Sequence, residues 1–297
     1  SQKWSPSLIY ASGFGTGIVW LVLALTGFIK KIVKLTPKCV IRGIQLALGI
    51  LLAIEGLKMI SGGLLLGIIS ILIVLIFREN KYASAAIVLM VLGLGIMGFQ
   101  GKLLKVIHLE ISLPPITIFT FREIWKGLIL AGFAQIFLTL TNAVIATAAL
   151  IREYWPDKAV SEKRLALNMG IMNTVVPFFG GMPMCHGAGG LAGQYYFGAR
   201  TGGTNIMEGL IEVSLGLFLS KSIQSLFSVF PMSIIGAMMI LVGIELAKFI
   251  KDIRGKVEIL VLIITTSLSI VTNIAIGFIS GIALYQIFKR FKTIKIN

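Results

Sequence analysis

One glycine-rich stretch, residues 180–198, carries backbone and side-chain groups that could bind a ligand within an apolar chain. It reads Gly-Gly-Met-Pro-Met-Cys-His-Gly-Ala-Gly-Gly-Leu-Ala-Gly-Gln-Tyr-Tyr-Phe-Gly and holds one of the two histidines. Glycine and proline weaken helices, and the stretch is too short to cross a bilayer as one helix. Irregular backbone at membrane depth is tolerated only where protein buries it or a cavity hydrates it. The stretch therefore predicts a broken helix, extended over 180–185 and helical from about 186–188.

The start of such a half-helix has the chemistry of an anion site. Its first N–H groups have no intrahelical partner, and they lie at the positive end of the helix dipole. Broken helices that point at a substrate near the bilayer midplane are typical of secondary transporters. We expect the ligand-facing positions of this stretch to be Met184, Cys185, His186, Gly187, Ala188 and Gly189.

Each of these residues also has a simpler interpretation. The glycines would equally serve tight helix packing, and His186 would serve as a core residue with a satisfied hydrogen bond. A charged histidine inside a membrane is costly and usually faces a cavity, which favours a role in the site. Met184 and Cys185 are soft metal ligands, but two residues do not make a metal site. We therefore predict no metal and no cofactor.

A second polar group interrupts the apolar run 125–151, where Gln135, Thr139, Thr141 and Asn142 occur together. Gln135 and Asn142 are seven positions apart, which is about two turns of an α-helix, so they would share one face. Such a stripe either faces a cavity or bonds neighbouring helices to one another. We expect the cavity, with Gln135, Thr141 and Asn142 contributing to substrate binding.

Four glutamates also lie in or near apolar runs: Glu55, Glu208, Glu212 and Glu245. Each is either a structural partner of a basic group or part of a proton path, and the sequence leaves both interpretations open.

The composition is that of an integral membrane protein. Hydrophobic residues make up 57% of the chain, charged residues 13%, and the mean hydropathy is +0.96. The net charge of +15 would suggest nucleic acid in a soluble protein. Here the basic residues cluster between apolar runs, which is the positive-inside pattern, so nucleic-acid binding is excluded. Neither paired acids nor a His-Glu-x-x-His motif indicates an enzyme.

Apolar runs recur along the whole chain and predict an all-α polytopic membrane protein with no soluble domain. We expect eleven helical elements, ten roughly spanning and one, 180–198, short. The runs are 8–29, 40–60, 63–77, 83–99, 125–151, 165–179, 180–198, 206–219, 232–250, 257–271 and 274–288. The longest polar connection is 100–122, which contains His108, Glu110 and a Pro-Pro pair.

The orientation follows from where lysine and arginine concentrate. The basic segments are 30–42, 78–81, 152–164, Arg200, 248–256 and the tail 289–295. The intervening connections are poorer in basic residues, although 100–126 has four. Basic loops face the cytoplasm. We therefore expect a multi-pass protein of the cell membrane with a cytoplasmic C-terminus, and with Ser1 and the 100–122 connection outside.

The order of elements suggests an inverted repeat. Seven elements run from 125 onward, and the third of them is the broken one, whereas four complete runs precede 100. Transporters are often built from two inverted repeats with the substrate between them. We assign 1–99 to the remainder of a first repeat and 123–290 to a second, within one transmembrane domain spanning 1–297. Three elements, one of them broken, are expected to precede Ser1.

Two stretches carry a resemblance to a known family. They are Ala-Gln-Ile-Phe-Leu-Thr-Leu-Thr-Asn-Ala-Val-Ile-Ala from Ala134 and Met-Pro-Met-Cys-His-Gly-Ala-Gly-Gly-Leu-Ala-Gly-Gln-Tyr from Met182. They resemble the plant and prokaryotic molybdate transporters, distant relatives of the SulP sulfate permeases. The segments Arg-Gly-Ile-Gln-Leu-Ala-Leu-Gly from Arg42 and Gly-Ile-Glu-Leu from Gly243 are similar to the same family.

The resemblance implies an inverted seven-plus-seven fold with a tetrahedral oxyanion between two half-helices. About eleven of the fourteen elements are present here, and the family's Pro-Val-Gln-Pro-Met-Lys motif of the first half-helix has no counterpart in this chain. Molybdate is the first expected substrate and sulfate or tungstate the next, each recognised through its oxygens. Membrane lipid is an expected partner, and a coupling proton or other ion and a homodimer stay open.

The leading hypothesis is a secondary transporter in which a core carrying 180–198 rocks against a gate. The gate would consist mostly of 40–99 and 206–271. An anion channel is a competing class, because the same half-helix would serve it. Its uptake would not saturate and would follow the membrane voltage.

Overall fold

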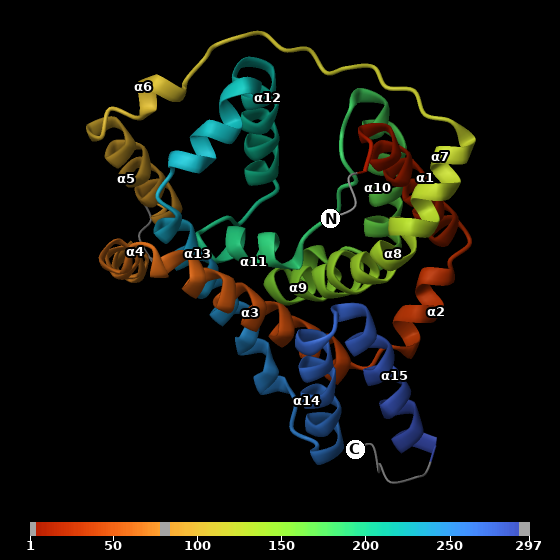
Figure 1. The fold of residues 1–297 in the computed structure, drawn as a ribbon. Coiled ribbons are helices and arrows are strands. Elements are labelled where there is room, and N and C mark those ends of the chain that lie inside the picture. The colour runs from red at the N-terminus through yellow and green to blue at the C-terminus, as the bar shows by residue number, and fades with distance from the viewer. Residues whose placement is uncertain (1–3, 78–83, 291–297) are drawn as a thin grey trace. The chain divides into compact units, whose positions relative to one another are not determined.

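The computed structural model describes residues 4–77 and 84–290. Within these ranges the regular elements are all helices, as the sequence predicts (Figure 1). The basic residues Arg78 and Lys81 and the tail beyond Arg290, which entered the orientation argument, lie outside the described residues. The chain divides into two compact units, one of 1–48, 115–191 and 247–297 and the other of 49–114 and 192–246.

The first unit contains the elements around the predicted half-helix. They are α1 (Pro6–Leu25), α2 (Phe28–Leu35), the beginning of α3 (Lys38–Ser61), α7 (Phe121–Gly127), α8 (Phe133–Thr139), α9 (Thr147–Tyr154), α10 (Glu162–Val175), the beginning of α11 (Ala188–Tyr196), α14 (Lys256–Val271) and α15 (Ile274–Arg290). The sequence predicts one basic loop over 30–42. The structure instead has the short helix α2 there, separated from α1 by Gly27 with φ +73°.

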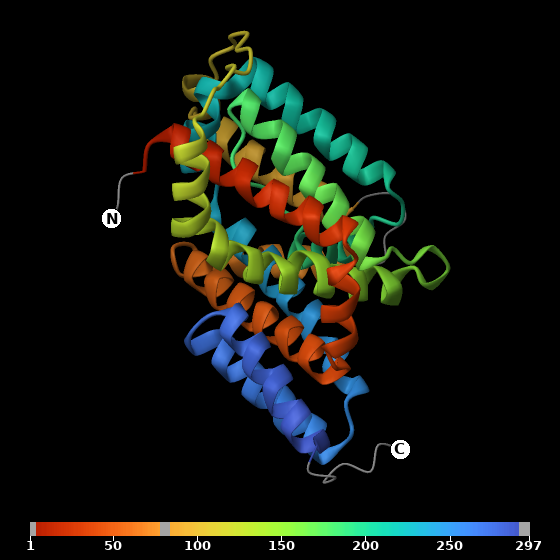
Figure 2. The same cartoon turned by 90° about the vertical axis from the view of Figure 1, so that its right-hand side faces the viewer.

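Helices α1 and α10 pack side by side, and both ribbon views show them adjacent in red and green (Figures 1 and 2). The contact is close because Gly17 has no side chain: a Cβ there would lie 2.7 Å from the carbonyl carbon of Asn173. Small residues allow helix backbones to approach in this way in membranes. Trp20, Ile145 and Met169 are buried in the core of this unit.

The predicted run 125–151 is a helix with two π-helical segments, Leu128–Gly132 and Leu140–Ala146. In the second, Thr147 donates from its N–H and from its hydroxyl to the carbonyl of Asn142, five positions earlier. A π-turn contains more residues than an α-turn, so the seven-residue spacing of Gln135 and Asn142 no longer corresponds to two α-turns. The expectation of a shared α-helical face rested on a regular helix, which the chain does not form there.

The second unit contains the rest of α3 and α11 together with α4 (Leu64–Phe77), α5 (Ala85–Phe99), α6 (Leu103–Val106), α12 (Gly203–Val229) and α13 (Met232–Ala247). Helices α3 and α13 meet at glycines: a Cβ on Gly49 would lie 2.5 Å from the carbonyl oxygen of Gly243. Helix α12 continues to Val229, beyond the predicted end at 219, with a kink at Leu219 where φ is −131°.

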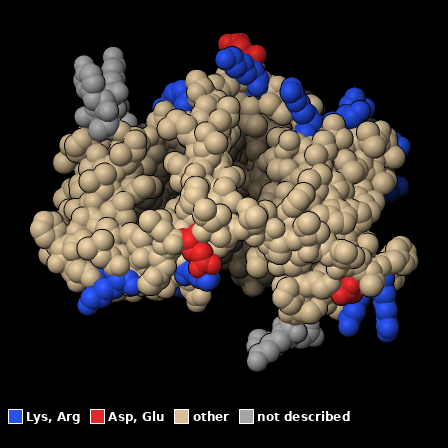
Figure 3. Space-filling model, turned by 90° about the horizontal axis from the view of Figure 1, so that it is seen from above, with Lys and Arg blue, Asp and Glu red and all other residues tan. Residues whose placement is uncertain are grey.

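The surface agrees with a membrane protein. In the space-filling view, most of the visible face is made of residues without charge, and lysine and arginine lie at its margins (Figure 3). Three helical segments of the described residues combine at least 18 residues with a strongly apolar composition: Pro6–Leu25, Lys38–Ser61 and Met232–Asp252. Leu64–Phe77 and Ala85–Phe99 are shorter apolar helices. By this length criterion, fewer segments qualify than the ten expected from hydropathy.

Candidate functional site

The chain between α10 and α11 forms the predicted break. Helix α10 is followed by a 3₁₀ turn, Val176–Phe179, and by Gly180 with φ +73°, a conformation that side chains rarely adopt. Residues 181–187 form neither helix nor strand and are referred to below as the extended segment, and α11 begins at Ala188. The carbonyl of Gly187 accepts the N–H of Leu191 at 3.0 Å, which closes the first turn. The predicted break and a helix start at about 186–188 are confirmed, whereas Gly180 forms a left-handed turn instead of belonging to an extended 180–185.

Asn173 on α10 fastens this extended segment. Its side-chain oxygen accepts the N–H of Met184 at 2.9 Å, and its amide nitrogen donates to the carbonyls of Met184 at 2.7 Å and Met169 at 2.9 Å. The side chain is buried, with 2% of Asn173 exposed. Extended backbone in a membrane needs such internal partners. Asn173 was not among the predicted site residues, because a single asparagine in an apolar helix has no distinguishing pattern.

The connection before α7 supports the end of α10. The N–H of Thr117 donates to the carbonyl of Phe178 at 2.9 Å, and the Thr117 hydroxyl donates to the carbonyl of Pro177. The ring of Phe178 packs against Phe119, 5.0 Å between centroids, and against Phe14 of α1 at 5.4 Å. The end of the polar connection, at Thr117 and Phe119, therefore holds the turn from which the half-helix follows, a role its composition did not indicate.

Asn142 lies at the start of α11. Its side-chain oxygen accepts the N–H of Ala188 at 3.3 Å, so the second π segment and the half-helix meet at this residue. The N–H groups of Gly189 and Gly190 follow within the first helical turn, where the helix itself offers no acceptor. The structure thus brings Asn142, Gly187, Ala188 and Gly189 together, as we expected from the sequence.

The other predicted residues have different surroundings. Thr141 is fully buried, and its hydroxyl donates to the carbonyl of Leu138 at 2.9 Å. His186 is partly buried, and its Nε2 is buried without a partner among the described residues. Met184 and Cys185 are exposed. Within the described residues, no cluster of three His, Cys, Asp or Glu side chains could hold a metal ion.

A cavity of about 400 Å³ borders the extended segment within the first unit. Its wall is formed by α1, α8, Trp4 and the extended segment, and none of its side chains carries a charge. The lining residues are Trp4, Ile9, Ser12, Thr16, Gln135, Met182 and Pro183. Gln135 is therefore the predicted polar residue that faces a cavity, whereas Asn142 is not part of this wall.

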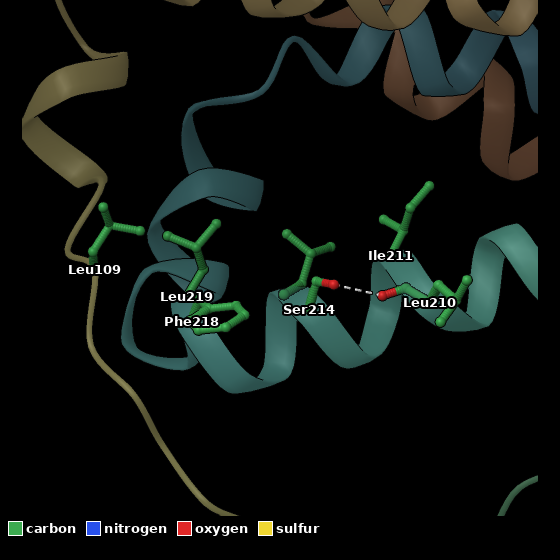
Figure 4. Close-up of a pocket in the computed structure, with 7 residues that line it drawn as sticks. Leu109, Leu210, Ile211, Ser214, Phe218 and Leu219 are labelled. Carbon is green, nitrogen blue, oxygen red and sulfur yellow. Dashed lines mark hydrogen bonds between the residues drawn. The ribbon is translucent and has the colours of Figure 1, made fainter.

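A second cavity, of about 330 Å³, lies within the other unit. Figure 4 shows that its side chains come from α12 and from the chain around Leu109. Its walls are almost entirely apolar, and the Ser214 hydroxyl within it donates to the Leu210 carbonyl at 2.7 Å. Its Ser214 hydroxyl is already engaged within its own helix, so the lining offers little to an anion.

The all-α arrangement with a broken helix is consistent with the inverted-repeat transporter fold, and solved structures share this fold. SLC26A9 matches 97% of this chain and 51% of its own, with a TM-score of 0.66 and 16% identity. The transmembrane domain of the cyanobacterial bicarbonate transporter BicA matches 94% of this chain and 76% of its own, with a TM-score of 0.58 and 17% identity. These likenesses show the fold, and the chain spans about half of the SLC26A9 chain.

The chain belongs to the family described as "Molybdate transporter of MFS superfamily", whose profile matches residues 1–52 and 127–246. Molybdate transporter 1 of Arabidopsis thaliana is 29% identical over 94% of this chain and 71% of its own length. Molybdate transporter 2 of the same plant is 28% identical over 97% and 73%. The putative sulfate transporter YbaR of Bacillus subtilis is 24% identical over 94% and 61%. The predicted family, its relation to sulfate permeases and its assignment to transporters rather than enzymes are confirmed.

Proposed function

We propose that this chain is a secondary transporter subunit that binds a tetrahedral oxyanion, molybdate first, at the N-terminus of α11. The names of its relatives support molybdate, and the name of YbaR makes sulfate the next candidate. The observation that carries the proposal is the start of α11 at Ala188 after seven non-helical residues, with the Asn142 amide at the same end. Helix N-termini of this kind are ready-made anion sites.

The donors suit an anion that must be both bound and released. A dianion loses many water hydrogen bonds when it enters a site, and an uncompensated buried charge costs several kcal/mol. The N–H groups of Gly189 and Gly190 offer hydrogen bonds without a countercharge that would trap the ion. The helix dipole adds about 0.3–1 kcal/mol. The amide nitrogen of Asn142 would donate to the same anion while its oxygen holds Ala188.

The remaining predicted residues would act around this point. Gln135 would line the approach through the 400 Å³ cavity. His186, Met184 and Cys185 would flank the half-helix, and Thr141 would stabilise the π segment that presents Asn142. Transport would follow from rocking of the part that carries 180–198 against a gate of 40–99 and 206–271. A location in the cell membrane with a cytoplasmic C-terminus, a homodimer and a coupling proton or other ion belong to the same proposal.

Uptake of molybdate into liposomes containing the purified protein, measured by mass spectrometry of molybdenum, tests the proposal. Gly187→Val adds a side chain at the mouth of the half-helix, where a Cβ would meet only the Gly190 nitrogen at 3.7 Å, so the fold should tolerate it. The valine side chain would block the approach of the anion to the backbone N–H groups. Losing one charge-assisted hydrogen bond in this way costs about 1.5–3 kcal/mol, so the apparent constant for molybdate should rise about tenfold or more. The matched control is Gly95→Val on α5, where a Cβ meets nothing within 4 Å.

Two substitutions at Asn142 distinguish a role in anion binding from a purely structural role. Asp is a good helix cap, so Asn142→Asp would keep the acceptor for the Ala188 N–H. It would also place a negative charge beside the anion. We expect Asn142→Asp to lose molybdate uptake while keeping its thermal stability, and Asn142→Leu to raise the apparent constant at least about tenfold. Unchanged saturation in Asn142→Asp and Gly187→Val would mean that the anion binds elsewhere. Competition by sulfate measures selectivity in the same assay.

A further inference from the structure

The short helix α2 is amphipathic in three sectors. Ile29 is fully buried, and Ile32 and Val33 pack against the core of the first unit. Lys30, Lys31 and Lys34 are exposed. Two large apolar side chains are exposed as well, Phe28 by 49% and Leu35 by 55%. The helix therefore presents both cations and apolar groups outward, beyond what its packing on the core requires.

The helical period arranges these groups in order around the axis. At about 100° per residue, Lys30, Lys34 and Lys31 occupy one continuous sector, and Leu35 and Phe28 occupy the next. This is the pattern of a helix that lies in the plane of a membrane interface, with cations toward the headgroups and apolar side chains toward the acyl chains.

The position of α2 in the chain fits that plane. It follows α1, a 20-residue apolar helix long enough to cross a bilayer, after the turn at Gly27 (Figure 1). Helix α15 ends beside it, since the Gln286 amide nitrogen donates to the Leu35 carbonyl at 3.4 Å. The last described residues of α15, Lys289 and Arg290, are exposed and add two cations to this end of the unit.

The surrounding acids do not neutralise the three lysines. Asp252 is already paired with Arg42 at 2.5 Å and with Lys38 at 3.2 Å. Among the described residues, Lys30, Lys31 and Lys34 form no ion pair. Glu258, in the first turn of α14, is a further acid of this unit. The surface keeps an excess of exposed positive charge next to exposed apolar side chains.

We propose that α2 is a binding surface for anionic phospholipids, in which Lys30, Lys31 and Lys34 hold the headgroup phosphates. Phe28 and Leu35 enter the upper acyl region. A soluble phosphate compound would satisfy the lysines but would leave both apolar side chains in water, whereas a lipid satisfies both sectors at once. Basic residues close to an anionic membrane surface each contribute favourably. The proposal does not depend on the identity of the transported anion.

Native mass spectrometry of the detergent-purified protein tests this with dioleoyl phosphatidylglycerol and dioleoyl phosphatidylcholine, which share their acyl chains. We expect the wild-type protein to bind the anionic lipid at least about fivefold more tightly. The triple variant Lys30→Gln, Lys31→Gln, Lys34→Gln should lose most of that preference and keep its affinity for phosphatidylcholine. Replacing the same three lysines by arginine should retain the preference.

The control removes three other exposed lysines, Lys102, Lys105 and Lys126, and so changes the net charge equally. It should leave the preference for phosphatidylglycerol intact. An equal loss in this control would show that only net charge matters and would overturn the proposal, as would an unchanged α2 triple variant. Displacement of the bound lipid by millimolar inorganic phosphate would assign the site to a soluble anion instead. A thermal melt of each variant confirms that it is folded.

Discussion

We predict that the Asn173 side chain holds the extended segment before α11 in place. Replacing Asn173 by leucine keeps a similar volume but removes both hydrogen bonds to the backbone of Met184. Each such bond is worth about 0.5–1.5 kcal/mol net, and a buried group left unpaired costs about 1–3 kcal/mol. Met184 is 39% exposed, so water would replace part of the loss. We therefore expect a destabilisation of about 2–3 kcal/mol.

The measurement combines a thermal melt with amide hydrogen exchange in detergent. Asn173→Leu should lower the melting temperature by about 3–5 °C, since the unfolding entropy is about 2.1 cal/mol/K per residue. Exchange should accelerate selectively over residues 181–187, because the lost bonds hold that segment to α10. Molybdate uptake should fall with it, since the start of α11 depends on the position of the segment.

The matched control is Thr174→Val, one position along α10. The Thr174 hydroxyl donates only to carbonyls of its own helix, Gly170 at 2.9 Å and Ile171 at 3.0 Å. Valine should therefore change stability by less than about 0.5 kcal/mol. If hydrogen exchange over 181–187 were the same in Asn173→Leu as in the wild type, the inference that Asn173 holds this segment to α10 would be refuted.

Two further predictions concern charged residues. Arg42 is 1% exposed and pairs with Glu153 and Asp252, whose side chains are 38% and 37% exposed. Arg42→Met should cost about 2–3 kcal/mol in chemical denaturation, below the fully buried case because water reaches both acids. Lys58→Gln in an exposed pair should cost under about 1 kcal/mol, and equal losses would contradict the argument. The backbone N–H of Thr120 and the Ser7 hydroxyl lower the pKa of Glu123, before the run 125–151. Its stabilisation is present above the unfolded pKa, about 4.3, and is lost as pH falls through the folded value, so Glu123→Gln should flatten the acid limb of a stability profile.

The break between α10 and α11 was predictable because its cause is local. Gly180 takes a positive φ, and Pro183 and the following glycines disfavour a helix, so the residues that interrupt the helix are visible in the sequence. The meeting of Asn142 with the start of α11 was also expected in outline, because two polar stretches in an apolar chain have few partners besides each other.

The supporting contacts could not be predicted in the same way. The hydrogen bonds from Asn173 to Met184 depend on which face of α10 meets the extended segment, and that face is set by tertiary packing at Gly17. The π segment over 140–146 changes the residue spacing without a proline or glycine to mark it. Helix α2 was taken for a loop because its eight residues are short and its lysines dominate the composition. Its Ile-Lys-Lys-Ile-Val period was the available signal.

The most direct test of the central claim is to locate molybdenum by its anomalous X-ray scattering in crystals of the protein soaked with molybdate. The account predicts one strong peak at the start of α11, with molybdate oxygens about 2.7–3.2 Å from the N–H groups of Gly189 and Gly190. The Asn142 amide would lie in contact with the same anion, and soaking of Asn142→Asp crystals should abolish the peak. A peak at another position, with none at this helix end, would contradict the account.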